Sequence, residues 1–452
     1  MDHRLLRIYL FAVVTAALVA GCTPLPVAPV TMPEMTLVPS HTPTTMEPTA
    51  TTLPVIPTDT AQPPTPAPPL PEAGIAWMDI SAGGRWIAFA TYPDAAGSQG
   101  VFLHDRETGQ TRYIAAGSMP SLSADGRYLA YGLPPTFPFV EEGKPSAIYV
   151  YGQETGEHEL VSVSSSGGPA NGVSGHPVIS ADGRYVAFES SATNLVDEPS
   201  ASIWFDVYLH DRETGATERI QYAGYGAEAY ASSGPGVSAD GRYAVFVSGL
   251  VEPPPGDERP EGMFVYDRQT GEAQAVGSGF FPVLSADGSM LVYLSRGDAP
   301  PYAEGWINAF AYHLVTGERR WLGRVLDFPP DGWWQEQVIT VSADGAKIAF
   351  RSVLDNPRDP AIPSPEPAGG LGSVYLTIRA FVYDWAADTL ERVDAPASPD
   401  VNSSMPHISG DGRFVAYLSG GVGDPVSAYR LFVRDLETGV SEAVDLSAPV
   451  WP

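Results

Sequence analysis

The 452-residue sequence contains a single cysteine, Cys22, so it cannot form an intramolecular disulfide. Basic residues are also scarce: 25 Lys and Arg stand against 53 Asp and Glu, and the formal net charge is −28. Phosphate backbones are bound by cationic faces, so this deficit argues against a nucleic-acid partner. Regular helix signals are few as well, so the folded part of the chain must be built from another element.

Glycine and proline, in contrast, are abundant. The 46 Gly and 45 Pro punctuate short runs of β-branched and aromatic residues. Such punctuation is typical of many short strands joined by turns, and it predicts an all-β fold.

The N-terminus has the pattern of an export signal. Arg4 and Arg7 precede an apolar run at residues 8–20, which is too short for a membrane span, and "VAGC" follows at once. This stretch resembles a bacterial lipoprotein signal, and the resemblance implies cleavage before Cys22 and lipidation of Cys22. We therefore expect residues 1–21 to be a signal peptide and the protein to be exported and lipid-anchored to the cell membrane, facing the periplasm or the outside. The alternative is an ordinary secretory signal that ends in Gly-Cys.

Residues 22–72 are expected to form a tether. Residues 23–72 contain 15 Pro and 12 Thr, with four acidic residues and no Lys or Arg. Such a composition buries too little apolar surface to fold, and proline favours an extended chain. The folded domain is therefore predicted at residues 73–452.

A short motif recurs along this domain, as in "PVISADGRYVAFES" at residues 177–190. Its serine recurs at intervals of 42 to 67 residues, which is typical of a propeller or solenoid. The seven serines are Ser81, Ser123, Ser180, Ser238, Ser285, Ser342 and Ser409. A second motif follows each time, as in "VYLHDRETGATERI" from Val207. This pattern predicts four strands in each unit, with an Asp-Gly turn between the first and second strands and a Thr-Gly turn between the third and fourth.

The two halves, "P-x-h-S-x-D-G-x-x-h-A-F" and "hYhhD-xx-T-G", resemble the WD40-like PD40 repeat of TolB-like proteins. The resemblance covers residues 76–446 and implies a β-propeller. The TolB propeller has six blades, whereas seven units are present here, so we expect seven four-stranded blades. All units run in the same strand order, so we expect the ring to close by packing of unit one against unit seven, without an exchanged strand.

The repeated aspartates of the Asp-Gly turns are interpreted as turn formers that bond locally, not as a ring of functional carboxylates. They are Asp125, Asp182, Asp240, Asp287, Asp344 and Asp411. The G-x-S-x-G, H-E-x-x-H and P-loop motifs are absent, so no catalytic residue is assigned. No metal or cofactor is expected.

Candidate binding residues come from positions that vary in the first strand of each unit, because this strand lies nearest the channel of a propeller. They are expected to converge near one mouth as a mixed polar and aromatic funnel for a ligand. They are Trp77, Asp79, His176, Phe281 and His407. The alternative is that these side chains only pack between blades. Trp333 and Trp334 are a candidate surface platform for a sugar or partner, or else a cluster that covers the rim.

Three functions are compatible with this pattern. The first is a non-catalytic envelope lipoprotein whose propeller binds a protein, peptide or glycan. The second is a hydrolase or lyase that acts on carbohydrate or peptide from the channel, with groups such as Asp79, His176 and His407. The third is a purely structural envelope protein. Three or more titratable groups within hydrogen-bond reach would favour the enzyme.

Overall fold

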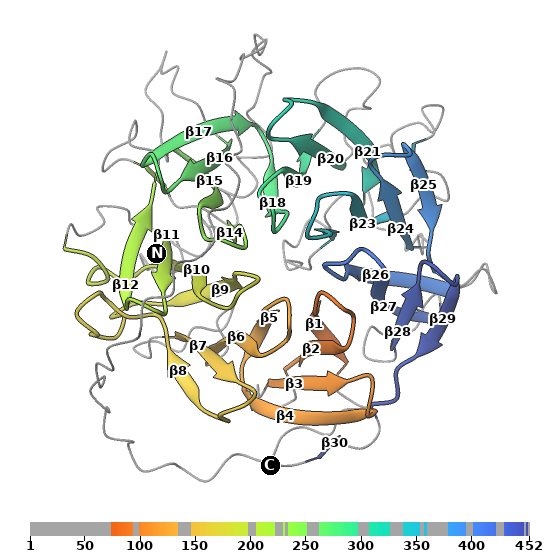
Figure 1. Ribbon diagram of the computed structural model, residues 1–452, viewed down its shortest axis with the longest axis horizontal. Helices are drawn as coiled ribbons and strands as arrows, with labels where there is room; N and C mark the ends of the chain where they lie inside the picture. The colour runs from red at the N-terminus through yellow and green to blue at the C-terminus, as the bar shows by residue number, and fades with distance from the viewer. Residues whose placement is uncertain are drawn as a thin grey trace, which may run out of the picture.

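Seven antiparallel sheets, each built from four strands that are consecutive in the sequence or nearly so, stand around a central axis (Figure 1). The computed structural model describes residues 74–93, 99–133, 146–197, 205–221, 229–230, 234–250, 262–296, 307–325, 338–352, 357–358, 378–394, 401–421, 429–446 and 449–450. Among these residues, no helix has the length and hydropathy that a membrane crossing requires. Residues 1–73, with Cys22, and the pair Trp333 and Trp334 lie outside the described residues.

The strands follow the predicted order in every blade, from the innermost strand to the outermost. Blades one to three consist of β1 (Ile75–Ile80), β2 (Trp86–Thr91), β3 (Gly100–Asp105), β4 (Gln110–Ala116); β5 (Ser118–Leu122), β6 (Tyr128–Leu133), β7 (Ala147–Gly152), β8 (His158–Leu160); β9 (Ser174–Ile179), β10 (Tyr185–Ser190), β11 (Asp206–Asp211) and β12 (Ala216–Ile220). Blades four and five consist of β14 (Gly236–Val237), β15 (Tyr243–Leu250), β16 (Gly262–Asp267), β17 (Glu272–Gly277); β18 (Phe280–Leu284), β19 (Met290–Arg296), β20 (Ile307–His313) and β21 (Arg319–Val325). Blades six and seven consist of β22 (Ile339–Val341), β23 (Lys347–Ser352), β24 (Arg379–Asp384), β25 (Thr389–Arg392); β26 (Val401–Ile408), β27 (Phe414–Gly421), β28 (Arg430–Asp435) and β29 (Val440–Ala443).

The prediction of a seven-bladed β-propeller is therefore confirmed, and so is closure without an exchanged strand. Two short strands add to this plan. β13 (Ala229–Tyr230) pairs with the end of β15, and β30 (Pro449–Val450) pairs in parallel with the outer strand β4 of blade one (Figure 1). The chain thus returns to its first blade only at the outer edge.

Each blade is centred on two aromatic rings that face each other across its second and third strands. The "A-F" of the first motif and the "F" or "Y" of the second place these rings directly opposite in the antiparallel register. In all seven blades the rings stack with centroids 5.3 to 6.0 Å apart. The pairs are Phe89–Phe102, Tyr131–Tyr149, Phe188–Tyr208, Phe246–Phe264, Tyr293–Phe310, Phe350–Phe381 and Tyr417–Phe432. Cross-strand aromatic pairs stabilise sheets, which explains why the repeat keeps these positions.

The apolar core is divided into seven clusters, one at each boundary between neighbouring blades. The cluster that closes the ring joins Met405, Leu418 and Val433 of blade seven to Ile80 and Phe89 of blade one. Its members are as buried as those at the other boundaries. Closure therefore depends on the same hydrophobic contact that joins every other pair of blades.

The Asp-Gly turns are stabilised by a local hydrogen-bond pattern that recurs in blades two to seven. In blade three the Ser180 hydroxyl donates to Asp182 at 2.5 Å, the same carboxylate accepts from the Arg184 backbone N–H, and Ser180 Oγ accepts from Tyr185 N–H at 2.9 Å. The corresponding Ser and Asp of the other five blades are joined in the same way. The repeated aspartates are thus turn formers, as predicted.

These turns also bond to one another around the channel. In four blades the residue after the serine donates its backbone N–H to the carbonyl oxygen of a turn in the next blade, as in Ala82 to Ala124 at 2.8 Å and Ala124 to Ala181 at 2.9 Å, and in blades five and seven the following aspartate donates instead. The N–H of Asp411 in blade seven donates to the carbonyl of Ala82 in blade one at 2.9 Å, so the pattern crosses the closure. The repeated motif therefore links the backbones of neighbouring blades at six boundaries, in addition to forming the hairpins.

Candidate functional site

The five residues predicted to line the channel lie on four inner strands, β1, β9, β18 and β26 (Figure 1). They occupy two register positions. Trp77, His176 and Phe281 stand four residues before the motif serine, whereas Asp79 and His407 stand two residues before it.

The first of these positions has an unusual backbone conformation in five of the seven blades. There the residue four before the serine has a positive φ, between 50° and 69°, and it always precedes a proline. The five residues are Met119, His176, Gly234, Phe281 and Met405. In blades one and six the position is followed by Met78 and Ile339, and the positive φ is not found. Positive φ in a residue other than glycine is strained and often marks a functional site. Its recurrence with proline in five blades shows that here it belongs to the repeat.

In three blades a polar side chain at the second position ties the inner strand to the next blade. Asp79 Oδ2 accepts a hydrogen bond from the backbone N–H of Leu122 in blade two at 2.7 Å, and Oδ1 accepts from Ile80 N–H at 2.8 Å. Ser121 repeats the tie from blade two to Ile179 of blade three at 3.2 Å. Thr340 likewise accepts from Ile408 of blade seven. The Asp79 carboxylate therefore has a structural use at this register.

Asp79 and His407 come together across the boundary between blades one and seven. His407 Nδ1 lies 3.9 Å from Asp79 Oδ1, which is an ion-pair distance but too long for a hydrogen bond. The His407 side chain is only 3% exposed, and its Nε2 atom has no hydrogen-bond partner among the described residues. This pair is the part of the predicted funnel that the structure brings together.

His176 forms a separate pair within blade three. Its Nδ1 atom lies 3.1 Å from Oε2 of Glu189 on β10, and the second oxygen of Glu189 accepts from Gly234 N–H of blade four at 2.7 Å. Glu189 is 6% exposed, so it is a buried acid held by a histidine and a backbone amide. Sequence reasoning missed Glu189, because it considered only first strands and Glu189 lies in a second strand.

The two aromatic candidates are used in packing. Trp77 packs against the apolar cluster between blades one and two. Phe281 packs edge-on against Phe280, with centroids 5.5 Å apart, and against the cluster between blades five and six. The five candidates therefore divide into separate sets. Among the described residues, no three His, Cys, Asp or Glu side chains are grouped so that they could hold a metal ion.

A different site lies on the turn face, which we define as the face that carries the Asp-Gly and Thr-Gly hairpin turns. At three blade boundaries an arginine covers this face. In blades one, three and four an arginine that follows the "D" of the second motif reaches back over an aromatic ring of the preceding blade and pairs with an acid there. We call Arg106, Arg212 and Arg268 the stapling arginines.

The geometry of the stapling arginines is repeated closely. Arg212 lies 4.4 Å above the Tyr128 ring of blade two and bonds to Glu159 of the same blade at 2.6 Å. Arg268 lies 4.7 Å above Tyr185 and pairs with Glu218 of blade three. In blades one, three, four and seven, the aspartate of the second motif accepts two hydrogen bonds from one arginine of its own blade. In blade three, burial raises the pKa of Asp211, but hydrogen bonds from Arg184 and the Glu213 amide outweigh it and lower this pKa to about 2.

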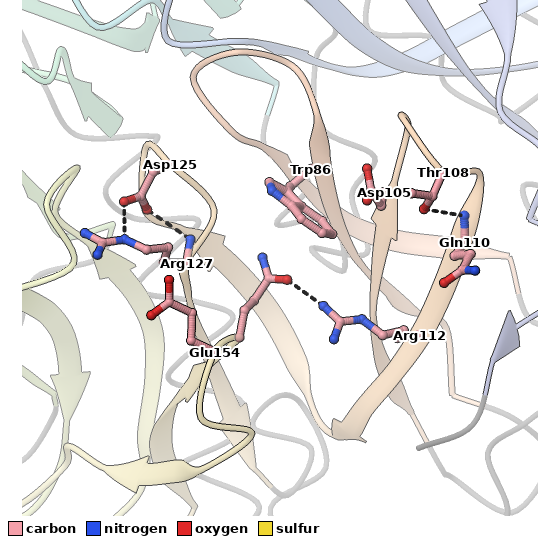
Figure 2. A pocket seen from close by; sticks show the side chains of 9 residues that line it. Trp86, Asp105, Thr108, Gln110, Arg112, Asp125, Arg127 and Glu154 are labelled. Atoms are coloured by element: carbon pink, nitrogen blue, oxygen red, sulfur yellow. Dashed lines mark hydrogen bonds and ion pairs between the residues drawn. The ribbon is translucent and has the colours of Figure 1, made fainter.

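Between blades one and two the staple is missing, and a hollow of about 400 Å³ opens there. Figure 2 shows the Trp86 indole between the β3–β4 hairpin of blade one and two turns of blade two. The hollow is lined by Trp86, Asp105, Thr108, Gln110, Arg112, Asp125, Arg127, Gln153 and Glu154. Sequence reasoning missed it, although a signal was present: the second unit departs from the "D-R-x-T-G" pattern with Gly152 and Gln153.

Comparisons with known proteins agree with this architecture. The β-propeller domain of the Trilobed protease from Pyrococcus furiosus, described as having an open velcro topology, is 14% identical with a TM-score of 0.52, over 82% of this chain and 95% of that one. TolB from Acinetobacter baumannii is 16% identical with a TM-score of 0.40, over 78% and 65%. Oligogalacturonate lyase from Vibrio parahaemolyticus is 14% identical with a TM-score of 0.47, over 81% and 90%.

The chain is a seven-bladed β-propeller. At these identities the likeness shows the fold alone. No protein-family model matches the sequence, and no curated protein is detectably similar to it. Propellers of this shape occur among proteins with different activities, so the function must be argued from the side chains of this chain.

Proposed function

We propose that this protein is a non-catalytic cell-envelope lipoprotein whose propeller binds a protein, peptide or glycan partner. The observation that carries the proposal is the use of two carboxylates on the first and second strands of their blades. Asp79 and Glu189 each accept a backbone amide of the next blade, and each has one histidine beside it. A general acid or base needs a lone pair or proton directed at a substrate. These carboxylates are instead committed to joining blades.

The anchoring part of the proposal is carried by the sequence. The charged start, the short apolar run and "VAGC" resemble a lipoprotein signal, and the residues after Cys22 have the composition of an extended tether. Lipid on Cys22 would hold the protein at a membrane, and the tether would set the propeller away from it. A partner in the envelope is then within reach.

The second candidate is a channel-based hydrolase or lyase, and one observation favours it. Asp79 and His407 lie 3.9 Å apart, and His407 Nε2 is buried without a hydrogen-bond partner among the described residues. A carboxylate that orients a histidine is a known arrangement for proton transfer. A third group and a route for substrate would be needed to complete such a site.

The two candidates are separated by an Asp79→Asn variant. Asparagine keeps an oxygen that can accept from Leu122 N–H, so the blade tie is retained while the carboxylate charge is lost. The purified full chain and the variant are applied to glycan and peptide arrays. The compounds that bind are then incubated with each protein, and their masses are measured by mass spectrometry. We expect both proteins to bind the same compounds and to leave their masses unchanged.

The matched control is Ser121→Ala, which removes the equivalent tie between blades two and three and carries no charge. The binding role would be contradicted, and the enzyme established, if the parent chain converted a compound, Ser121→Ala still converted it and Asp79→Asn did not. The melting temperature of Asp79→Asn would have to equal that of the parent. If no arrayed compound bound to the parent chain, this result would also contradict the binding role.

A further inference from the structure

The boundary between blades one and two differs at four positions from the three boundaries that carry a stapling arginine. Blade one has Arg112 where blades two, three and seven have a glutamate that pairs with an arginine of the following blade. Blade two has Gly152 and Gln153 where blades one, three and four have Asp-Arg. Blade one also has an indole where the other blades have a smaller ring or no ring. The equivalents of Trp86 are Tyr128, Tyr185, Tyr243, Met290, Lys347 and Phe414.

These departures have one structural result. Gln153 is shorter than arginine and uncharged, so it forms no ion pair with blade one, although its amide still donates to the Gly126 carbonyl as each stapling arginine donates to the matching glycine. Arg112 instead donates to Gln153 Oε1 at 2.5 Å and stands 5.9 Å from the Trp86 centroid. Without the aspartate that Gly152 replaces, Arg127 turns to Asp125 of its own hairpin. The staple is thus exchanged for an open, polar hollow with an indole in its wall (Figure 2).

The lining of this hollow offers hydrogen-bond donors and acceptors in balance. Arg112, Arg127 and two glutamine amides carry further N–H donors, while Glu154 and the Thr108 hydroxyl can accept; the Asp125 carboxylate already accepts from Ser123 and Arg127. A ligand whose groups both donate and accept, such as a set of hydroxyls, matches this lining. A purely anionic ligand matches it less well, because three carboxylates lie in the wall and the whole chain carries a formal charge of −28.

The indole narrows the ligand class further. Trp86 is half-buried, because the Arg85 guanidinium lies 4.8 Å from its ring centroid and the Gly126 turn packs against it, and the rest of its apolar surface borders the hollow beside the polar groups. A pyranose ring has an apolar C–H face and polar hydroxyl edges, so it can rest on the indole while its hydroxyls bond to the surrounding side chains. A hollow of about 400 Å³ has room for one or two such rings.

We propose that the hollow between blades one and two binds a neutral saccharide, with Trp86 as the platform and Arg112 and Gln153 as hydrogen-bond donors. This inference deepens the proposed binding role and rests on it, because it assigns a glycan ligand and a site to the propeller. The site lies on the turn face and uses none of the inner-strand residues discussed above.

The test restores the staple. In the double variant Arg112→Glu/Gln153→Arg, the boundary regains the acid and the arginine found at the three boundaries with a stapling arginine, so the fold should be kept while the hollow is filled. The purified full chain is titrated with cellobiose, maltose, chitobiose and xylobiose, and with glucuronate as an acidic probe, while tryptophan fluorescence and heat are followed. We expect saturable binding of at least one neutral disaccharide and at least tenfold weaker binding by the double variant.

Two further variants protect the result against a folding artefact. Trp86→Met places the residue of blade five at this position, and we expect it to weaken binding at least tenfold as well. Arg212→Gln opens the equivalent groove between blades two and three without an indole, and we expect it to leave the affinity for the disaccharide unchanged. Melting curves of all variants are recorded beside the titrations.

Three outcomes would overturn the inference: none of the neutral disaccharides binds, only glucuronate binds, or the double variant and Trp86→Met both bind like the parent. These outcomes are distinguishable from failure of the proposed function. If the arrays detect a partner that the double variant also retains, the binding role stands and the assignment of this hollow is wrong.

Discussion

The replacement Gly183→Ala tests whether the Asp-Gly turns join the blades or only close the hairpins. Gly183 ends the turn of blade three with a φ of +78°, a conformation that alanine adopts at a cost of about 1–2 kcal/mol. A β-carbon here would also lie 2.3 Å from Cδ2 of Tyr128 in blade two. Displacing a packed ring typically costs about 1–3 kcal/mol more. We therefore expect Gly183→Ala to lower the free energy of unfolding by about 2–5 kcal/mol.

The same blade offers a matched control. Gly215, in the Thr-Gly turn, has a φ of +72°, but its β-carbon would meet no atom within 4 Å. Gly215→Ala should therefore show only the backbone cost, about 1–2 kcal/mol. Urea unfolding followed by fluorescence and circular dichroism measures both changes. Equal destabilisation by the two variants would refute the idea that the glycine is needed for contact with the preceding blade.

Three other predictions follow from charges and from the leader. Burial lowers the pKa of His210 to about 4, so this histidine stays neutral in the fold while the unfolded chain takes up a proton below its ordinary value of 6.5. The contribution of neutral His210 to stability is full above pH 6.5 and is lost as the pH falls toward 4, by up to about 1.4 kcal/mol per pH unit. The melting temperature of His210→Gln should therefore fall less steeply with decreasing pH than that of the parent. Parallel curves of melting temperature against pH would argue against this. Arg268→Gln removes the contact with Tyr185 and the ion pair with Glu218, and we expect it to lower the free energy of unfolding by about 1–2 kcal/mol in urea titrations; an unchanged urea midpoint would show that the staple adds no stability. Cys22→Ser should abolish labelling by a palmitate analogue and move the protein out of the membrane fraction, whereas persistent membrane association would contradict the lipid anchor.

The number and order of blades could be predicted because the repeat includes turn chemistry that has few alternatives. A Ser-x-Asp-Gly turn needs the glycine for its positive φ and the aspartate for its local bonds, so the motif is repeated whenever the hairpin is repeated. The stacked aromatic pairs fall at fixed distances from these turns. Seven turns therefore predicted seven hairpins and, with the second motif, seven sheets.

The candidate site was harder to predict, because its geometry depends on neighbours that are distant in sequence. That Asp79 and His407 lie at the same register position was visible, and their proximity follows once blade seven meets blade one. The pairing of His176 with Glu189 depends on a bulge and on a second strand. The hollow beside Trp86 results from residues that differ from the repeat, and these become visible only when each unit is compared with the one before it. The pairing of β30 with β4 involves two residues and left no pattern in the sequence.

The contact between the last blade and the first has a consequence for how such a molecule can be altered. It is made of an apolar cluster like those at the other boundaries and an amide-to-carbonyl bond like those at five of them, so apart from the short pairing of β30 with β4 this contact does not distinguish the blade at which the chain starts. The fold then does not require that the chain begin at blade one. A rearranged gene that starts at a different blade, with the old ends linked, should encode the same toroid.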